Sequence, residues 1–486
     1  MSIEPSYPTP ISFTIHTEVA PSYLSDLLVF IYQECVLPYY SHFTNVGKWV
    51  AEGKEVLTFT LNDTKGAWQI VVEISATNPI EVKLSPYGNL PPKLLDRLRE
   101  DLIISIQMFE EKVRRNTLYF AWVPENRVIP EKVDDTRRKV IRQIFMGNMI
   151  FFFLISIVLS FAAFIIITEV LDLPIIYFPF IMVLFQFIII LFSDKIIGSM
   201  GDWSITRSNP NVYILQYHIP PEQIELFRDK NIRDKLMQIK RSIQNRTFAL
   251  GRTVDIQIAQ EAFSEYGINI KPENIVIKTL NVYSIVERAA ARFKMSVPKI
   301  RLSNVIIPNA AATGPSPRFG LVLITTGLLV QLDEDEIFSV IGHEMSHVKN
   351  RDPMALFILT STEYILRIYF WPYIYFFGFF YLLFALGVIY FIAKFFEARA
   401  DLDSAVAIGQ PEFLANALRK IGYRKIQLER MHSNITESWL GWNPHPPISF
   451  RVDRLESLEE PQNIKHTFIK SIKDCINGLL DELRRI

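Results

Sequence analysis

The sequence predicts a multidomain, mainly α-helical integral membrane protein with four transmembrane helices and a soluble α+β domain at its N-terminus. Two observations support this prediction: 49% of the 486 residues are hydrophobic, and long uncharged runs lie between about 145 and 393. So much apolar surface must be buried in a core or in lipid, which excludes a disordered chain. The 51 basic and 51 acidic residues cancel, which argues against a nucleic-acid partner, because phosphates attract an excess of positive charge.

The first transmembrane hairpin is predicted from two apolar runs. Residues 143–168 include 26 uncharged positions in a row, and residues 173–193 include 21 more. Each run can cross ~30 Å of hydrocarbon at ~1.5 Å per residue, so we expect spans at about 145–168 and 173–193. Basic residues at 137–142 precede the first span, and the short connector carries only acids. The positive-inside rule therefore places the N-terminus, and everything after this hairpin, in the cytoplasm.

A second hairpin is predicted at about 354–393. Only Glu363 and Arg367 interrupt the 41 residues from Pro353 to Ala393, a length that allows two crossings with a turn near Trp371. Glu363 and Arg367 are four apart, so they can pair on one helix face and reduce the cost of burying either charge. The alternative is a hairpin that lies in the interface or packs against protein.

The soluble parts divide into three regions. Residues 1–140 form the predicted α+β cytoplasmic domain, 203–285 an α/β region, and 286–486 a domain that the second hairpin interrupts. In the first region we expect strands Ile11–Thr17, Val56–Leu61, Trp68–Ile74 and Ile80–Leu84 and helices Ser22–Cys35 and Pro91–Asn116.

In the second region, a strand at Val212–Ile219 precedes a charged helix over Pro221–Phe248. Four basic residues on this helix could form a solvated face or a patch for anionic lipid. They are Lys235, Lys240, Arg241 and Arg246.

A metal site is predicted around His343 and His347. They are four residues apart, so on a helix both can bind one ion from the same face. Glu344 is then placed to take a proton from a metal-activated water. The alternative, two polar histidines on a surface helix, requires no metal.

A third ligand is predicted further along the chain. Zinc with an open catalytic position needs three protein ligands, and Glu397 follows the second apolar hairpin. Asp401, four residues later, can accept a hydrogen bond from a ligand histidine and fix its tautomer. A helix carrying surface ion pairs would have a similar sequence. If His347 and Glu397 bind one ion, the chain between them must cross the membrane twice or not at all.

Longer motifs make the assignment specific. The stretch 286–353 contains NAAATG at 309–314, TGLL at 326–329 and HEMSH at 343–347, and ExxxD at 397–401 and HPPxxxR at 445–451 follow. From about Phe145 to Leu455 the chain resembles the HtpX-type membrane zinc metalloproteases, which share the last motif with the prenyl-protein (CAAX) zinc endoproteases. Residues 1–140 are outside this resemblance.

The resemblance implies a zincin-like protease domain with one zinc ion per chain. His343, His347 and Glu397 would hold the zinc, Glu344 would be the general base, and Asp401 would support a ligand. His445 and Arg451 would donate to the oxyanion. Asn309, before an expected edge strand at Gly320–Thr325, would orient the substrate backbone.

The resemblance also implies an endopeptidase for misfolded or membrane proteins, in contact with the bilayer of the cell membrane. Two alternatives stay open: a prenyl-protein processing protease, and a non-proteolytic membrane scaffold that retains the motifs.

Overall fold

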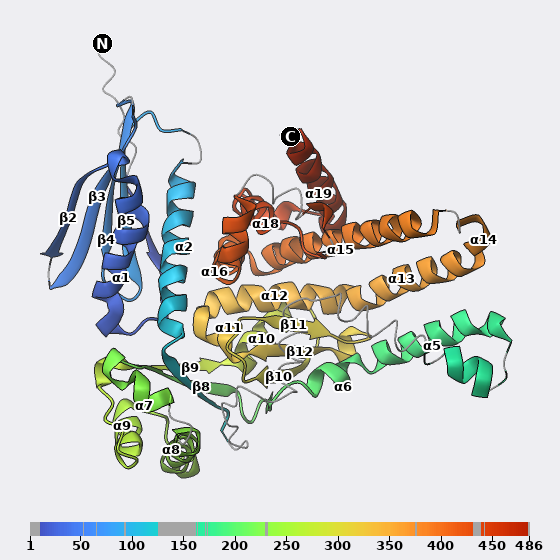
Figure 1. Ribbon diagram of the computed structural model, residues 1–486, viewed down its shortest axis with the longest axis horizontal. Helices are drawn as coiled ribbons and strands as arrows, with labels where there is room; N and C mark the ends of the chain where they lie inside the picture. Colours follow the sequence, from blue (N-terminus) through green and yellow to red (C-terminus); the bar gives the residue numbers. More distant parts are fainter. Residues whose placement is uncertain are drawn as a thin grey trace. The chain divides into compact units, whose positions relative to one another are not determined.

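The computed structural model describes residues 10–124, 162 and 164–484, with gaps at 52, 65, 92–93, 171, 173, 229–231, 375–376, 431–438 and 442. These residues form two compact units, which Figure 1 labels by element. The first unit comprises Met1–Val128, Tyr213–Thr279 and Val330–Asp333, and the second comprises Ile129–Val212, Leu280–Leu329 and Glu334–Ile486. Most of the predicted first span and the basic residues at 137–142 lie outside the described residues.

The first unit begins with a five-stranded antiparallel sheet in the order β1-β5-β4-β3-β2. Burial alternates along β4 and β5, so one face of the sheet packs into a core with helices α1 and α2. The predicted strands and helices are present, and the sequence analysis missed β2. The elements are β1 (Ile11–Ile15), α1 (Leu24–Ile31), β2 (Phe43–Ala51), β3 (Lys54–Asn62), β4 (Trp68–Ser75), β5 (Ile80–Gly88) and α2 (Leu94–Arg114).

A three-stranded sheet, ordered β6-β8-β9, continues this unit. Strand β6, which the sequence analysis also missed, pairs antiparallel with β8 from nearly a hundred residues later. The predicted long helix at 221–248 is described as a 3₁₀ turn followed by α7 and α8. The elements are β6 (Thr117–Trp122), β8 (Asn211–His218), α7 (Ile224–Arg228), α8 (Ile232–Arg246), α9 (Ile256–Ser264) and β9 (Ile275–Asn281).

A buried histidine ends β8. The Nε2 atom of His218 accepts a hydrogen bond from the N–H of Ala20 at 3.1 Å, and its Nδ1 lies 2.8 Å from the hydroxyl of Thr117. That hydroxyl donates to the carbonyl of Val113, so Nδ1 must carry the proton of the neutral ring. Burial lowers the pKa of His218 to about 4, because the charged ring would lose its hydration there.

The second unit is built on a four-stranded sheet in the order β11-β12-β10-β7. A strand is present where it was expected at Gly320–Thr325, but the prediction that it is an edge strand is wrong. This strand, β12 (Leu321–Thr325), lies inside the sheet, and all five of its residues are buried. The edge strand is β11 (Ala310–Thr313), which directly follows Asn309 and pairs antiparallel with β12. Its run of alanines offered no alternation of polar and apolar residues from which a strand could be predicted.

Helices make up most of this unit. They are α5 (Phe178–Leu191), α6 (Ser193–Gly198), α10 (Val282–Arg292), α11 (Thr326–Gln331), α12 (Glu334–Asn350), α13 (Asp352–Tyr369), α14 (Trp371–Ile374), α15 (Gly378–Ile408), α16 (Pro411–Glu429), α18 (Ile448–Glu456) and α19 (Thr467–Leu483). The remaining strands are β7 (Trp203–Ile205) and β10 (Lys299–Ser303).

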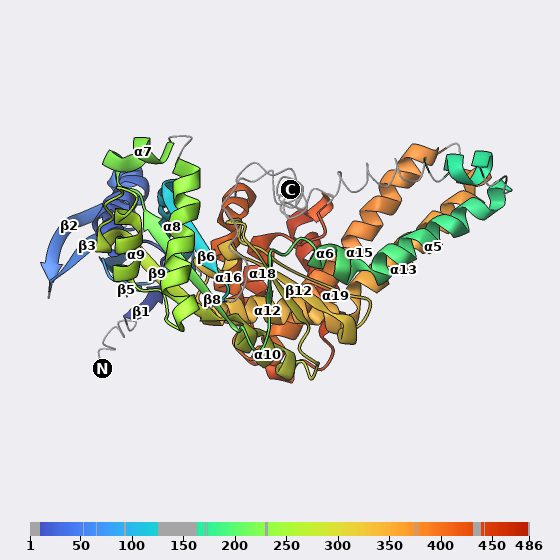
Figure 2. The ribbon, with the colours of Figure 1, turned by 90° about the horizontal axis from the view of Figure 1, so that it is seen from below.

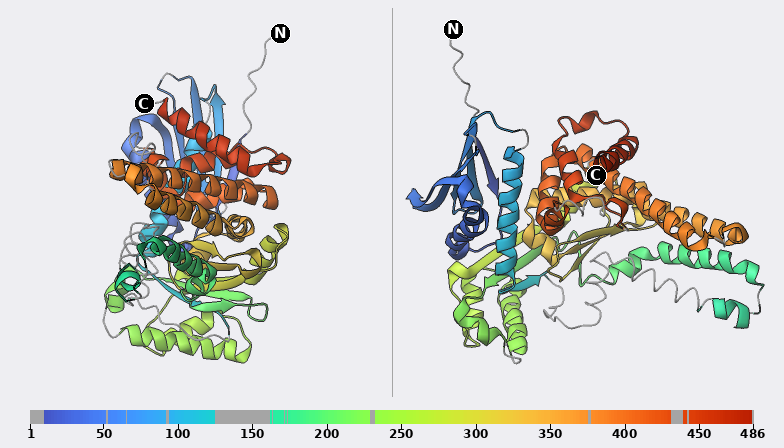
Figure 3. Two further views of the ribbon diagram at one scale, coloured as in Figure 1. Left: turned by 90° about the vertical axis from the view of Figure 1, so that its right-hand side faces the viewer. Right: turned by 45° about the horizontal axis from the view of Figure 1, so that its top comes forward.

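The apolar helices α5, α13 and α15 extend together from the sheet, as Figure 2 and the right-hand view of Figure 3 show. Phenylalanine rings join α5 to α13, with the centroids of Phe187 and Phe357 5.7 Å apart. Helix α13 runs outward and α15 returns, with the turn at α14 where the sequence predicts it. The predicted pair is confirmed, since Arg367 Nε donates to Glu363 Oε1 at 2.9 Å.

Within the described residues, one helix is long and apolar enough to span a membrane. It is the Phe380–Ile408 part of α15, and only 17% of its most apolar 18-residue stretch is buried. Helix α5 has 14 residues, and α13 carries Asp352, Glu363 and Arg367 along its 18 residues, which lowers its hydropathy. The prediction of four spans is therefore not confirmed.

Candidate active site

Two histidines project from one face of α12. The Nε2 atoms of His343 and His347 lie 3.2 Å apart, in a part of the helix that is largely buried. The neighbouring Gly342 lets α15 approach closely, because a Cβ at this position would lie 2.4 Å from the Cδ1 of Ile408. The predicted helical placement of both histidines is therefore observed.

Helix α15 brings Glu397 to the two histidines. Its Oε2 lies 3.5 Å from Nε2 of His343, and its Oε1 lies 3.4 Å from Nε2 of His347. The three side chains are at most 14% exposed, and one ligand atom from each lies within 4.8 Å of the others. Two imidazole nitrogens and one carboxylate oxygen are a donor set that zinc accepts. The residues predicted as ligands thus fit a zinc ion.

The charges around the histidines favour a cation. Burial alone would lower the pKa of His343, but the carboxylates of Asp401 and Glu397 raise it to about 10. Burial likewise opposes protonation of His347, whereas Glu397 and Asp352 raise its pKa above the ordinary value. The carboxylates thus favour protonation of the histidines, and a bound divalent cation would neutralise the same negative charge.

Each histidine is oriented by its own carboxylate. The Nδ1 of His343 lies 2.9 Å from Oδ1 of Asp401, the residue predicted to support a ligand histidine. The Nδ1 of His347 lies 2.8 Å from Oδ2 of Asp352, which the sequence analysis missed. Both contacts leave Nε2 available to a metal. Asp352 could have been found from its place five residues after His347.

Each of these carboxylates is held in turn by an arginine. Arg451, on α18, donates from Nε and Nη2 to the two oxygens of Asp401 at 2.8 and 2.7 Å. Burial opposes the charge of Arg451, but Asp401 raises its pKa above the ordinary value. Arg399 holds Asp352 through a single contact, from its Nη2 to Oδ1 of the carboxylate. In this arrangement Arg451 supports a ligand through Asp401, and its predicted contact with an oxyanion stays a prediction.

Glu344 lies beside the edge of the sheet. Its Oε2 accepts a hydrogen bond of 2.7 Å from the N–H of Ala312 in β11. Asn309, just before β11, is fixed by its backbone: its N–H donates to Oγ1 of Thr325 at 2.9 Å, and its carbonyl accepts from the Thr325 N–H. The predicted general base and the residue predicted to orient substrate thus lie at the two ends of one short edge strand.

His445 approaches the ligand cluster from a loop before α18. Its Nδ1 lies 2.7 Å from Oε2 of Glu397, and its side chain is 46% exposed. Lys394, one turn before Glu397 on α15, is buried and donates from Nζ to the carbonyls of Gly441 and Asn443. The side chain of Asn443 accepts from the N–H of His445 at 3.0 Å. Lys394 therefore fixes the loop that carries His445, a role for which the sequence offered no signal.

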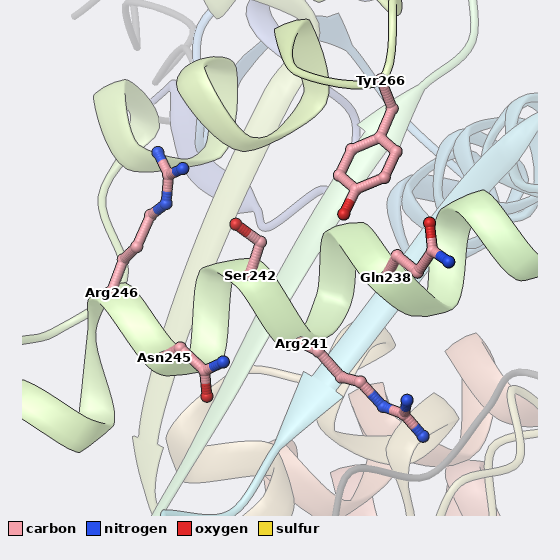
Figure 4. A pocket seen from close by; sticks show the side chains of 6 residues that line it. All are labelled: Gln238, Arg241, Ser242, Asn245, Arg246 and Tyr266. Atoms are coloured by element: carbon pink, nitrogen blue, oxygen red, sulfur yellow. The ribbon is translucent and has the colours of Figure 1, made fainter.

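The basic run on α8 does not form one patch. Lys240 is fully buried, and its ammonium lies 5.7 Å from the ring centroids of both Phe120 and Trp122. Figure 4 shows Arg241 and Arg246 pointing to different sides of the helix, and Arg246 pairs with Glu265. The shallow groove in that figure is lined by polar side chains. The four basic residues therefore do not share one surface, either as a solvated helix face or as a patch for anionic lipid.

Comparisons with known proteins agree with the geometry. Residues 277–459 match the model of Peptidase family M48. A protein named Protease HtpX homolog from Thermodesulfovibrio yellowstonii is 31% identical over 212 residues, which cover 36% of this chain and 74% of the relative. Its namesake from Thermococcus kodakarensis is 30% identical over 217 residues, 38% of this chain and 75% of the relative. No solved structure matches the chain.

Proposed function

The chain belongs to peptidase family M48, like the Protease HtpX homologues, and from this premise we propose that it is a membrane-bound zinc endopeptidase that hydrolyses misfolded or membrane proteins at the cytoplasmic face. One observation supports the chemistry above the others. His343, His347 and Glu397 converge on one point, and Glu344 lies beside them at the edge strand. This combination provides three ligands and a separate base, as a zinc peptidase requires.

The chemistry divides between zinc and the side chains. Zinc held by these ligands would polarise the scissile carbonyl and make water acidic enough to ionise near neutral pH. Glu344 takes the proton of the attacking water and passes it to the leaving amine. The Ala312 N–H holds the Glu344 carboxylate in place. His445, partly exposed beside Glu397, donates to the oxygen that gains negative charge.

The substrate would bind as an extended strand beside β11. An edge strand offers unpaired backbone groups along one side, which is the usual way to hold an extended peptide. Asn309 fixes the start of this strand through Thr325, and Ala312 near its end touches the base. A backbone-directed site of this kind suits unfolded chains of varied sequence.

The membrane placement is supported by the apolar surface of α5, α13 and α15. Large side chains along these helices are widely exposed, including Phe180 (53%), Ile358 (58%), Phe380 (72%) and Phe384 (72%). A soluble protein seldom leaves such a contiguous surface in water. Glu363 and Arg367 neutralise each other within it. We place the N-terminus, the active site and the C-terminus in the cytoplasm because of the basic residues before the first predicted span.

The peptidase function is tested with the full-length protein in detergent. We expect it to cut a denatured protein at internal bonds, and Glu344→Gln to lose this activity while the protein stays folded. Mass spectrometry of the products identifies the bonds that are cut. Release of single residues from the chain ends would refute an endopeptidase, and absence of any cleavage would favour the scaffold alternative.

Sidedness is tested with single cysteines and a reagent that cannot cross the membrane. We expect positions 170 and 373 to react from outside, and positions 100, 270 and 430 only after the membrane is opened. Labelling of 270 from outside would refute the cytoplasmic site. Protection of 373 with labelling of 170 would show that 354–393 does not span, although the ligands would still meet.

A further inference from the structure

Helix α19 (Thr467–Leu483) has more apolar surface than the described residues cover. One side packs on α15: Cys475 is fully buried, and the Phe468 ring stacks on Phe396 with centroids 5.9 Å apart. The neighbouring side is open, with four aliphatic side chains exposed to 40% or more. They are Ile469 (53%), Ile476 (40%), Leu480 (44%) and Leu483 (46%). This helix lies beyond the residues 277–459 that match the family.

The four exposed residues form one stripe. Their separations are seven, four and three residues. At ~100° per residue they fall within roughly 60° of the helix circumference. We call these four residues the α19 stripe. Lys473 and Arg484 lie beside it at one edge, where their side chains can reach outward.

The position of α19 relates this stripe to the membrane. A cluster of Phe391, Phe395, Cys475 and Leu479 joins the two helices, at the level where the apolar part of α15 ends at Lys394. Figure 1 shows α19 crossing α15 steeply instead of running beside it. If α15 crosses the bilayer, a helix that crosses α15 steeply at this level lies along the plane of the interface.

We propose that α19 is an interfacial anchor whose stripe lies in the headgroup and acyl boundary of the same bilayer that α15 crosses; this inference rests on the membrane placement in the proposed function. An amphipathic helix with one apolar face and adjacent basic residues binds such a boundary. Lys473 and Arg484 then face lipid phosphates. Phe384 and Val388 of α15 are also exposed, and in this arrangement the same bilayer would cover them and the stripe.

The anchor would act on the active site through α18. Arg454 of α18 donates to Oγ of Ser471 on α19 at 3.0 Å and to the carbonyl of Ala398 on α15 at 2.6 Å. Asp474 of α19 also accepts from Arg454. Helix α18 carries Arg451, which holds Asp401. The lipid contact of α19 thereby fixes the orientation of the catalytic domain at the membrane surface.

Spin labels test this inference. A single nitroxide is placed at 476 or 480 in full-length protein in which Cys35→Ala and Cys475→Ala remove the native thiols, reconstituted in vesicles of neutral and anionic phospholipid. The matched control position is Asn477, which is exposed on the same turn but outside the stripe. Position 384 on α15 serves as the membrane reference. Collision rates with oxygen, which enters lipid, and with a charged nickel complex, which does not, are compared at each site.

We expect oxygen collisions to exceed nickel collisions at 384, 476 and 480, and the reverse at 477. Nickel collisions dominating at 476 and 480, but not at 384, would overturn the anchor and leave the membrane enzyme intact. Nickel collisions dominating at 384 as well would refute the membrane placement itself. Low collision rates with both reagents at 476 and 480 would mean that protein covers the stripe, which also overturns the proposal.

Discussion

Replacing Lys394 by methionine should slow catalysis without removing the metal. The ammonium of Lys394 holds the carbonyls of Gly441 and Asn443, and Asn443 holds the backbone of His445. Methionine has a similar length but no donor, so Lys394→Met frees this loop while it keeps most of the packing. His445 would then sample positions away from Glu397 and away from the oxyanion.

The size of the effect follows from the lost contacts. A hydrogen bond from a charged donor contributes about 1.5–3 kcal/mol, which corresponds to roughly 10- to 150-fold in rate. Loss of one oxyanion donor costs about 10²–10³-fold, which sets the upper limit for an effect transmitted through His445. We therefore expect the turnover number of Lys394→Met to fall by roughly 10- to 100-fold, with the Michaelis constant changed much less.

A double-mutant cycle gives the decisive comparison. Turnover on a soluble denatured substrate is measured for Lys394→Met, His445→Ala and the double variant. If Lys394 acts through His445, its replacement should cost almost nothing once His445 is alanine. Lys420→Met is the control, because Lys420 is also buried but pairs with Glu336, and its effect should be additive. Equal losses from Lys394→Met in both backgrounds would refute the reasoning.

Three more predictions address the base, the ligand support and the first unit. Glu344→Gln should keep zinc but lower turnover by ~10²–10⁴-fold; zinc loss in this variant would make Glu344 a ligand instead. Asp352→Asn should weaken zinc binding by ~10–100-fold, measured by chelator competition, because His347 loses its carboxylate; unchanged affinity would show that Asp352 does not orient the ring. The unfolding free energy of the first unit should fall by up to about 3 kcal/mol as the pH is lowered from 6.5 to 4. The reason is that His218 binds a proton in the unfolded state from about pH 6.5 downward, whereas buried His218 in the folded state has a pKa of about 4. Denaturant unfolding of His218→Gln should lack this part of the loss, and an identical pH dependence in both proteins would contradict it.

The chemical residues could be predicted from the sequence because they follow helical spacing. His343 and His347, like Glu397 and Asp401, are four apart, so each pair shares a helix face before any tertiary contact is known. That Glu397 lies near His347 was also predictable, because the apolar segment between them is predicted to run out and back as a hairpin. The N-terminal sheet was predictable where apolar and polar residues alternate, as in β4.

The rest depended on contacts that spacing does not encode. Strand β11 contains three alanines and a threonine, so its role as the edge strand appears only from its pairing with β12. Strand β6 pairs with β8 across a long stretch of chain. Lys394 would be expected to mark a solvated helix end, and only the structure shows it buried against the His445 loop.

The central claim, a zinc peptidase whose base is not a ligand, is tested most directly by zinc titration of the metal-depleted full-length protein. Zinc content and cleavage of a denatured substrate are measured in the same samples. We predict that cleavage rises in proportion to bound zinc and saturates at one ion per chain. Glu344→Gln should bind the same amount without cleavage, and His347→Ala should bind little. Full cleavage by metal-depleted protein, or by Glu344→Gln, would contradict the account.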